Sequence, residues 1–247
     1  MSSDCPFCLR YVVLELKENA IIVSDIHYHP RYRREFLTLL SELESSPPPQ
    51  LILLGDIFDL LFGEVDWTIS LNKDVIQRLD RLGTKIEVIY FEGNHDFNLG
   101  NIFNNIHIVP ISKQPMRLRS GDIDIFLAHG DFQEGGIFYF YRRVIENRYL
   151  LKFLDWIDTK LGNIIIKHIE KREEQKEKCY QRGKADIRFQ KERGIYIYGH
   201  FHQNRGIQIG DSLYLLLSPF ACNKSSFVVK LKRHGICLEK YEFKDSE

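Results

Sequence analysis

Five short segments of the sequence place aspartate, histidine or asparagine residues directly after apolar runs. They are residues 24–27, 55–59, 93–96, 129–131 and 199–202. Carboxylate oxygens, imidazole nitrogens and an amide oxygen together suit Mn²⁺, Fe²⁺ or Zn²⁺ better than Ca²⁺. The supply of ligands exceeds what one ion needs. The pattern therefore indicates a centre of two divalent metal ions, which suits in-line attack on phosphorus.

Each segment also has an ordinary explanation when it is taken alone. Gly55-Asp56 and Gly93-Asn94 are common turn sequences, and a histidine pair can simply lie on the surface. Five such segments, each at the end of a predicted strand, are much harder to attribute to chance. We therefore interpret them jointly as one site.

The apolar runs predict the strands that must position these segments. Strands are predicted at residues 11–16, 20–24, 51–54, 86–91, 106–109, 123–128, 195–198, 213–217, 227–231 and 236–243. Apolar residues that recur on one helical face predict helices at 36–43 and 75–82. Ligands gather at the carboxyl ends of strands in sheets of α/β character. We therefore expect the five segments to meet at one edge of a β-rich layered core.

The order of these motifs, D-x-H, G-D-x-x-D, G-N-H-D, H and G-H-x-H, resembles that of the calcineurin-like metallophosphoesterases. The resemblance spans about residues 20–203, with one insertion. It implies an α/β (α+β) four-layer metallophosphoesterase fold, with a β-sandwich core flanked by helices and a helical insertion (lid). It also implies two divalent metal ions. The ligand types favour Mn²⁺, with Fe²⁺, Zn²⁺ or Mg²⁺ as alternatives.

The resemblance further implies roles for individual residues. It assigns three ligands to a first metal, three to a second and one bridging ligand: Asp25, His27 and His202; Asn94, His129 and His200; and Asp56. A hydroxide shared by the metals would attack phosphorus. His95, oriented by Asp96, would stabilise or protonate the leaving group. Asp59 is expected to support the ligands rather than to bind metal.

A narrower resemblance concerns the stretches "LLGDIFDLLFG", "GNHDFNLG" and "LAHGD" together with the helical insertion. They are similar to the UDP-2,3-diacylglucosamine hydrolases of lipid A synthesis, which release UMP and leave 2,3-diacylglucosamine 1-phosphate. The best-known branch of those enzymes has G-N-R-D, whereas position 95 is histidine here. The acidic residues that follow H-G-D in that branch are reduced to Glu134. The resemblance is therefore to a GNHD-type sister group.

The predicted insertion, residues 137–193, is aromatic, basic and helical. It carries 15 lysine and arginine residues against nine acidic residues, a net charge of +6. Such a segment can lie on an anionic membrane surface or hold acyl chains. The alternative is a helical cap that packs its own aromatic residues and exposes a charged face, as predicted for "EKREEQKEK". We expect Arg31, Arg142 and Arg143 to meet the substrate's phosphates.

The overall composition restricts the class of protein. The formal net charge is zero, which argues against a nucleic-acid binder. No export signal and no apolar stretch of membrane-spanning length is visible, so we expect one cytoplasmic domain over residues 1–247, peripheral on the inner membrane. The five cysteines are then expected to be reduced thiols. Cys5 and Cys8 lack the second pair that a zinc site needs.

Three functions follow from these observations. The leading one is a two-metal pyrophosphohydrolase acting on a UDP-glycolipid. The second is a phosphoesterase for a soluble nucleotide or another phosphoester. The third is a non-catalytic scaffold, which the complete ligand set and His95 argue against.

Overall fold

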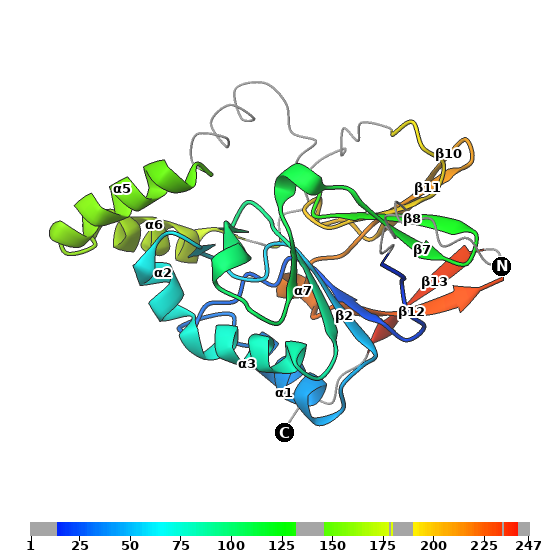
Figure 1. The fold of residues 1–247 in the computed structure, drawn as a ribbon, viewed down its shortest axis with the longest axis horizontal. Helices are drawn as coiled ribbons and strands as arrows, with labels where there is room; N and C mark the ends of the chain where they lie inside the picture. The colour runs from blue at the N-terminus through cyan, green and yellow to red at the C-terminus, as the bar shows by residue number, and fades with distance from the viewer. Residues whose placement is uncertain (1–13, 132–145, 178, 180–189, 234, 242–247) are drawn as a thin grey trace, which may run out of the picture.

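The structure is a computed structural model that describes residues 14–131, 146–177, 179, 190–233 and 235–241 (Figure 1). Its strands are β1 (Ile21–Val23), β2 (Gln50–Leu54), β3 (Leu61–Phe62), β4 (Glu87–Phe91), β5 (Asp96–Phe97), β6 (His107–Val109), β7 (Met116–Ser120), β8 (Ile123–Ala128), β9 (Ile195–Tyr198), β10 (Arg205–Ile209), β11 (Ser212–Leu216), β12 (Ser226–Lys232) and β13 (Gly235–Tyr241). Its helices are α1 (Phe36–Ser45), α2 (Asp66–Leu71), α3 (Lys73–Gly83), α5 (Arg148–Lys160), α6 (Ile164–Gln175) and α7 (Phe220–Asn223), with short 3₁₀ turns at Leu99–Asn101 and Ile111–Lys113.

Two sheets form the core. The first has the strand order β13-β12-β1-β2-β4-β6 and the second has the order β10-β11-β9-β8-β7. Side chains alternate between the faces of a strand. Ile52 and Leu54 therefore point into the cluster between the sheets, together with Ile125 and Leu127 of the second sheet. Burial on both faces explains why β2 has a continuous apolar sequence.

Helices α1 and α3 cover the outer face of the first sheet (Figure 1). Leu39 and Leu43 of α1 and Leu79 of α3 pack there against Leu51 and Leu53 of β2. The two predicted helices are present in the structure, since their apolar faces match the observed buried residues. The predicted β-sandwich flanked by helices is confirmed.

The strand directions bring the polar segments together. Strands β1, β2 and β4 are mutually parallel, and so are β8 and β9. Within each sheet their carboxyl ends therefore lie at the same edge, and residues that follow β2, β8 and β9 come within 4.8 Å of one another. A small third sheet, β3 with β5, holds the loop after β2 against residues 96–97.

Helices α5 and α6 lie in the sequence between β8 and β9, and they project away from the sheets beside α2 (Figure 1). The Asn147 side chain caps α5 by accepting hydrogen bonds from two backbone N–H groups of its first turn. The Asp158 carboxylate accepts the N–H groups of Ile165 (2.8 Å) and Ile166 (2.9 Å), which fixes the start of α6. The two helices thus form an ordered hairpin. None of the helices in the described ranges is long and apolar enough to cross a membrane.

Candidate metal centre

The backbone of the predicted ligands adopts an uncommon conformation. Positive φ angles of 51–58° occur at five of them: Asp25, His27, Asp56, His200 and His202. A non-glycine residue in this left-handed region costs on the order of 1–3 kcal/mol, and such residues cluster at functional sites. The surrounding structure must therefore hold these loops in place.

Two glycines allow the loops to approach one another. Gly55 has a φ of +79°, and a Cβ there would overlap the imidazole of His129. A Cβ on Gly199 would overlap the Ser24 hydroxyl and the Asp25 carboxylate. Since only glycine fits both positions, the two sheets can bring their loops into direct contact.

The first group of side chains comes from the ends of β1 and β9. Asp25, His27 and His202 each offer a ligand atom, and these atoms lie within 4.8 Å of one another. His202 Nε2 lies 3.2 Å from Asp25 Oδ1. This is the triad that the sequence predicts for the first metal.

The second group joins β2 to the second sheet. Ligand atoms of Asp56, His129 and His200 also lie within 4.8 Å of one another. His129 Nε2 is 3.4 Å from Asp56 Oδ2, and His200 Nδ1 is 3.2 Å from His129 Nε2. Asp56 Oδ2 also lies 3.9 Å from His27 Nε2 of the first group. Asp56 therefore stands between the two groups, as a bridging ligand must.

Asn94 provides a test of whether this site fits metal ions. Its Oδ1 atom is buried, and no hydrogen-bond partner for it is present among the described residues. A buried amide oxygen without a partner is costly unless it meets a cation or water. The donor set of imidazole nitrogens and carboxylate oxygens also suits first-row divalent metals. The residues present therefore fit a pair of such ions.

The buried carboxylates and histidines of the site shift one another's pKa values. Burial alone would raise the pKa of Asp25, but the neighbouring His202 outweighs it and holds that pKa far below its usual value. Burial likewise opposes ionisation of Asp56, yet His129 holds the pKa of Asp56 well below the usual range. Burial would lower the pKa of His129, but Asp56 raises it well above the ordinary value. Both carboxylates are thus charged at neutral pH and attract positive charge.

His95 lies beside both groups. Its ring packs edge-on against the ring of His27, with centroids 4.8 Å apart. Its Nδ1 lies 2.8 Å from the carbonyl oxygen of Asp59, which can only accept, so Nδ1 carries the hydrogen. Its backbone N–H donates to Asp56 Oδ1 (2.9 Å). The orientation of the ring leaves Nε2 for a substrate.

Asp96 does not hold His95 in the way that the sequence suggested. Its carboxylate accepts the backbone N–H groups of Asp56 (2.9 Å) and Ile57 (2.6 Å) and the hydroxyl of Tyr90 (2.6 Å). It therefore supports the loop that carries Asp56, while the Asp59 carbonyl orients His95. The physical reason is that the turn at 93–96 directs the Asp96 side chain back under the β2 loop.

Asp59 is fully buried and supports a predicted ligand. Its Oδ1 lies 3.3 Å from His27 Nδ1, and its Oδ2 accepts from the Tyr32 hydroxyl (2.8 Å) and from Arg33 Nη1 (3.1 Å). A buried carboxylate this close to Nδ1 helps to orient the ring of a metal-binding histidine.

Of the three arginines predicted to bind the substrate, the structure describes only Arg31. Arg31 extends from the loop after β1 and pairs with the Glu170 carboxylate of α6. Arg142 and Arg143 lie outside the described residues. Their contact with substrate phosphates stays a prediction.

The sequence interpretation of "EKREEQKEK" as an exposed helix is wrong for two residues. Glu170 and Glu173 are only 2% and 7% exposed. With Ile166 they follow the spacing i, i+4, i+7 and form the buried face of α6. That spacing was the available signal, but charged residues on a helix are normally assigned to solvent.

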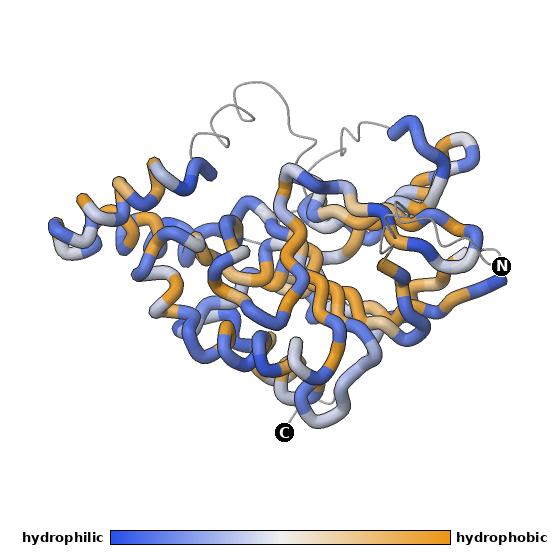
Figure 2. Tube along the Cα trace, in the orientation of Figure 1, coloured by the Kyte–Doolittle hydropathy of each residue, from blue (hydrophilic) through white to orange (hydrophobic). Residues whose placement is uncertain are grey.

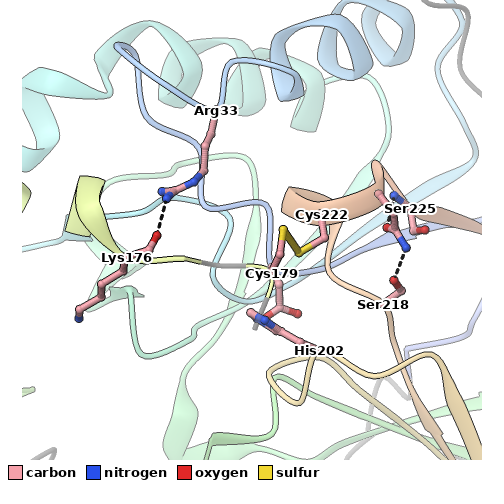
Figure 3. The surroundings of a disulfide bond; sticks show 9 residues. Arg33, Lys176, Cys179, His202, Ser218, Cys222 and Ser225 are labelled. Carbon is pink, nitrogen blue, oxygen red and sulfur yellow. Dashed lines mark hydrogen bonds and ion pairs between the residues drawn. A yellow bond between two sulfur atoms is a disulfide. The ribbon is translucent and has the colours of Figure 1, made fainter. Parts of the chain in front are cut away.

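The expectation of reduced thiols also differs from the structure. Cys179, which follows α6, forms a disulfide with Cys222 of α7, with Cα atoms 5.2 Å apart (Figure 3). Helix α7 is itself tied to the first metal loop, since the N–H groups of Phe220 and Ala221 donate to the carbonyl oxygens of Ser24 and Asp25. Sequence spacing could not reveal this pairing, because the two cysteines meet only through the tertiary fold. Cys5 and Cys8 lie outside the described residues.

Removing this disulfide should destabilise the protein. For Cys222→Ser we expect a loss of about 2–4 kcal/mol, because the unfolded chain regains freedom over the 43-residue separation. The corresponding fall in melting temperature is roughly 5–15 °C, measured by thermal unfolding without reductant. Cys237→Ser, at an exposed free cysteine, is the matched control and should melt like the parent. Equal melting temperatures for all three proteins would contradict the disulfide.

The chain belongs to the calcineurin-like phosphoesterase family, whose sequence profile matches residues 19–204. It is thus a metal-dependent phosphoesterase of the hydrolase class, and its family uses divalent metal ions. Two curated relatives, from Blochmanniella pennsylvanica and Coxiella burnetii, are named UDP-2,3-diacylglucosamine hydrolase. The first is 27% identical and the alignment covers 74% of this chain and 78% of the relative. The second is 22% identical, with coverages of 76% and 81%.

The E. coli phosphoesterase Yfce is similar at 17% identity with a TM-score of 0.45, and the alignment covers 92% of this chain and 100% of that structure.

Proposed function

We propose that this protein is a two-metal pyrophosphohydrolase that cleaves UDP-2,3-diacylglucosamine to UMP and 2,3-diacylglucosamine 1-phosphate. The observation that carries the phosphate chemistry is the convergence of two ligand groups on Asp56. The curated relatives with this activity in their names support the choice of substrate. In this proposal the reaction belongs to lipid A biosynthesis, as the resemblance of the sequence motifs implies.

In this proposal the metal ligands divide as their positions suggest. Asp25, His27 and His202 would hold one ion, and His129 and His200 would hold the other, with Asp56 between the two groups. Asn94, whose buried Oδ1 has no hydrogen-bond partner among the described residues, would be a further ligand of the second ion. The ions, Mn²⁺ by preference, would supply a nucleophile at neutral pH and neutralise the phosphate oxygens.

The protein's own residues would protonate the leaving oxygen and orient the metal ligands. His95 would present Nε2 to the leaving phosphate oxygen; since Nδ1 already donates its hydrogen to the Asp59 carbonyl, the proton on Nε2 comes from the imidazolium form, which returns to the neutral ring with its hydrogen on Nδ1. Asp59 lies 3.3 Å from Nδ1 of His27 and would orient that ring for metal binding. Asp96 keeps the Asp56 loop in place through backbone N–H groups.

An exposed apolar face on the α5–α6 hairpin supports a lipid substrate. Tyr149 is 81% exposed and Trp156 is 60% exposed, and Phe153 stacks beside Trp156. The remaining large apolar residues exposed on this hairpin are Leu154, Leu161, Ile164, Ile165 and Ile169. Figure 2 shows hydrophobic segments on both helices of this hairpin, separate from the hydrophobic strands of the core. Apolar side chains next to lysines such as Lys152 are typical of surfaces that meet anionic lipid.

This exposed apolar face also supports a location at the inner membrane surface.

A pocket of about 620 Å³ lies between α6, α2 and the loop after β1, and it is lined by residues that include Arg31, Trp67, Leu71 and Lys167. Lys167 lies over the Trp67 ring, 4.7 Å from its centroid. The proposed substrate would span from this region to the metals, with its acyl chains toward the bilayer.

The test is incubation of the protein with Mn²⁺ and UDP-2,3-diacylglucosamine in detergent micelles, following UMP by chromatography. We expect UMP to appear and to depend on the metal. The alternative function is a phosphoesterase for a soluble nucleotide or other phosphoester. Turnover of bis(4-nitrophenyl) phosphate without any UMP release from the glycolipid would replace the proposal by that alternative.

A further inference from the structure

Helix α6 buries two carboxylates against the loops of the candidate site. Glu170 and Glu173 lie one turn apart on its inner face, whereas Lys171, Arg172 and Glu174 between and beside them are exposed. Burying a carboxylate is costly unless polar partners compensate. The partners of each carboxylate therefore indicate what it does.

Glu170 docks the helix. The Arg31 backbone N–H donates to His29 Nδ1 (3.2 Å), so His29 carries its hydrogen on Nε2, which donates to Glu170 Oε1 (2.9 Å). Trp67 Nε1 donates to Glu170 Oε2 (3.4 Å), and Arg31 pairs with the same carboxylate. These contacts attach α6 to the loop that begins at His27 and fully explain the burial of Glu170.

Glu173 reaches farther into the site. A carboxylate oxygen of Glu173, a ring nitrogen of His95 and a carboxylate oxygen of Asp59 all lie within 4.8 Å of one another. Lys176 pairs with Glu173 from the solvent side. The imidazole of His95 thus lies beside two buried carboxylates, one from the core and one from the α5–α6 hairpin.

Arg33 links Asp59 to the chain at the end of α6. Its Nη1 pairs with Asp59 Oδ2 (3.1 Å), and its Nη2 donates to the carbonyl oxygen of Lys176 (3.1 Å), just past the end of α6 (Figure 3). The disulfide of Cys179 holds the next stretch of chain. Glu173 is therefore held in place by contacts on both sides of it along the chain.

We propose that Glu173 is a positioning residue for His95, so that the docked α6 helix is a working part of the phosphate-cleaving site. In this proposal the charge of the nearby Glu173 carboxylate orients the His95 ring electrostatically, while the Asp59 carbonyl holds Nδ1 by a hydrogen bond, so that Nε2 stays directed at the leaving oxygen. Two like charges near one ring oppose folding. A function that needs the His95 imidazole in a fixed orientation would explain why the protein tolerates this cost. The proposal rests on the role proposed above for His95.

The experiment is a double-mutant cycle on kcat with Glu173→Gln and His95→Ala. Glutamine keeps the size of the side chain and removes its charge, so folding is preserved and checked by melting temperature. We expect E173Q to lower kcat about 10- to 100-fold, the range typical of residues that orient a reacting group, with KM changed less than about twofold. In the H95A background the same substitution should have no further effect, because it acts through His95.

Three further measurements complete the design. Bound metal, measured by elemental analysis, should stay the same in E173Q. Glu177→Gln, at an exposed glutamate just past α6, is the matched control and should keep parental kcat. Glu173→Asp should restore part of the lost kcat, since it returns the charge with a shorter reach.

Specific results would overturn the proposal. They are parental kcat in E173Q, effects of E173Q and H95A that multiply, or loss of metal in E173Q, which would make Glu173 a ligand. The cycle is measured with bis(4-nitrophenyl) phosphate as well as with UDP-2,3-diacylglucosamine. Absence of UMP release by the parent protein would reject the glycolipid substrate alone, while the cycle on the soluble diester still decides the role of Glu173.

Discussion

Replacing Asp56 by alanine is expected to remove bound metal and activity together. Asp56 is the carboxylate that approaches both groups of candidate ligands, with Oδ2 3.9 Å from His27 Nε2 and 3.4 Å from His129 Nε2. Without it, two dications would have no bridging negative charge between them. The loss of kcat/KM should exceed the about 10- to 100-fold that is typical for residues that only orient ligands.

The measurement is metal content by elemental analysis beside kcat/KM, with circular dichroism to confirm folding. Asp56→Asn is the sharper variant, because it keeps an oxygen that can accept the His95 backbone N–H. It should still bind metal poorly, since the amide is neutral. Two equivalents of metal in both variants would show that Asp56 is not the bridging ligand.

Replacing His95 by alanine is expected to separate metal binding from catalysis. His95 contacts the Asp59 carbonyl and Asp56 through hydrogen bonds, but the site has seven other predicted ligands, six of them in the two groups described above and the seventh Asn94. The variant should therefore keep both metals. Its kcat should fall about 10²- to 10⁴-fold, the usual contribution of a general acid.

His107→Ala provides the control, because His107 is an exposed histidine on β6. That variant should retain the parental kcat and metal content. Parental kcat in His95→Ala would show that the proton reaches the leaving oxygen by another route. Loss of metal from His95→Ala would instead place His95 among the ligands.

The predicted strands show which strands can be recognised from local sequence alone. The strand predicted at residues 123–128 coincides with β8, and the run at 51–54 lies within β2. Both are continuous or alternating apolar runs next to glycine, the signal that depends least on distant residues. In contrast, β7 and β10 were not predicted, because their sequences MRLRS and RGIQI alternate with charged or polar residues on an exposed face.

The contacts of Asp96 show where sequence reasoning stops within the site. Its neighbour in the sequence is His95, so a direct interaction was the natural prediction. In the structure its carboxylate reaches the backbone of residues 56–58 on another strand loop. Which groups the Asp96 carboxylate contacts depends on how β2 and β4 pair, and no local sequence pattern specifies that pairing.

The sequence by itself determined the family, the sandwich of strands flanked by helices, and the order of the polar loops. These follow from short-range patterns: apolar runs that form strands, glycines that permit tight turns, and ligand types at the strand ends. The tertiary structure alone decided that Asp59 rather than Asp96 orients His95, and that Glu170 and Glu173 are buried. It also decided that Cys179 meets Cys222. The physical reason is that burial and pairing of a charged or reactive group depend on partners far away in the chain, and only packing brings those partners together.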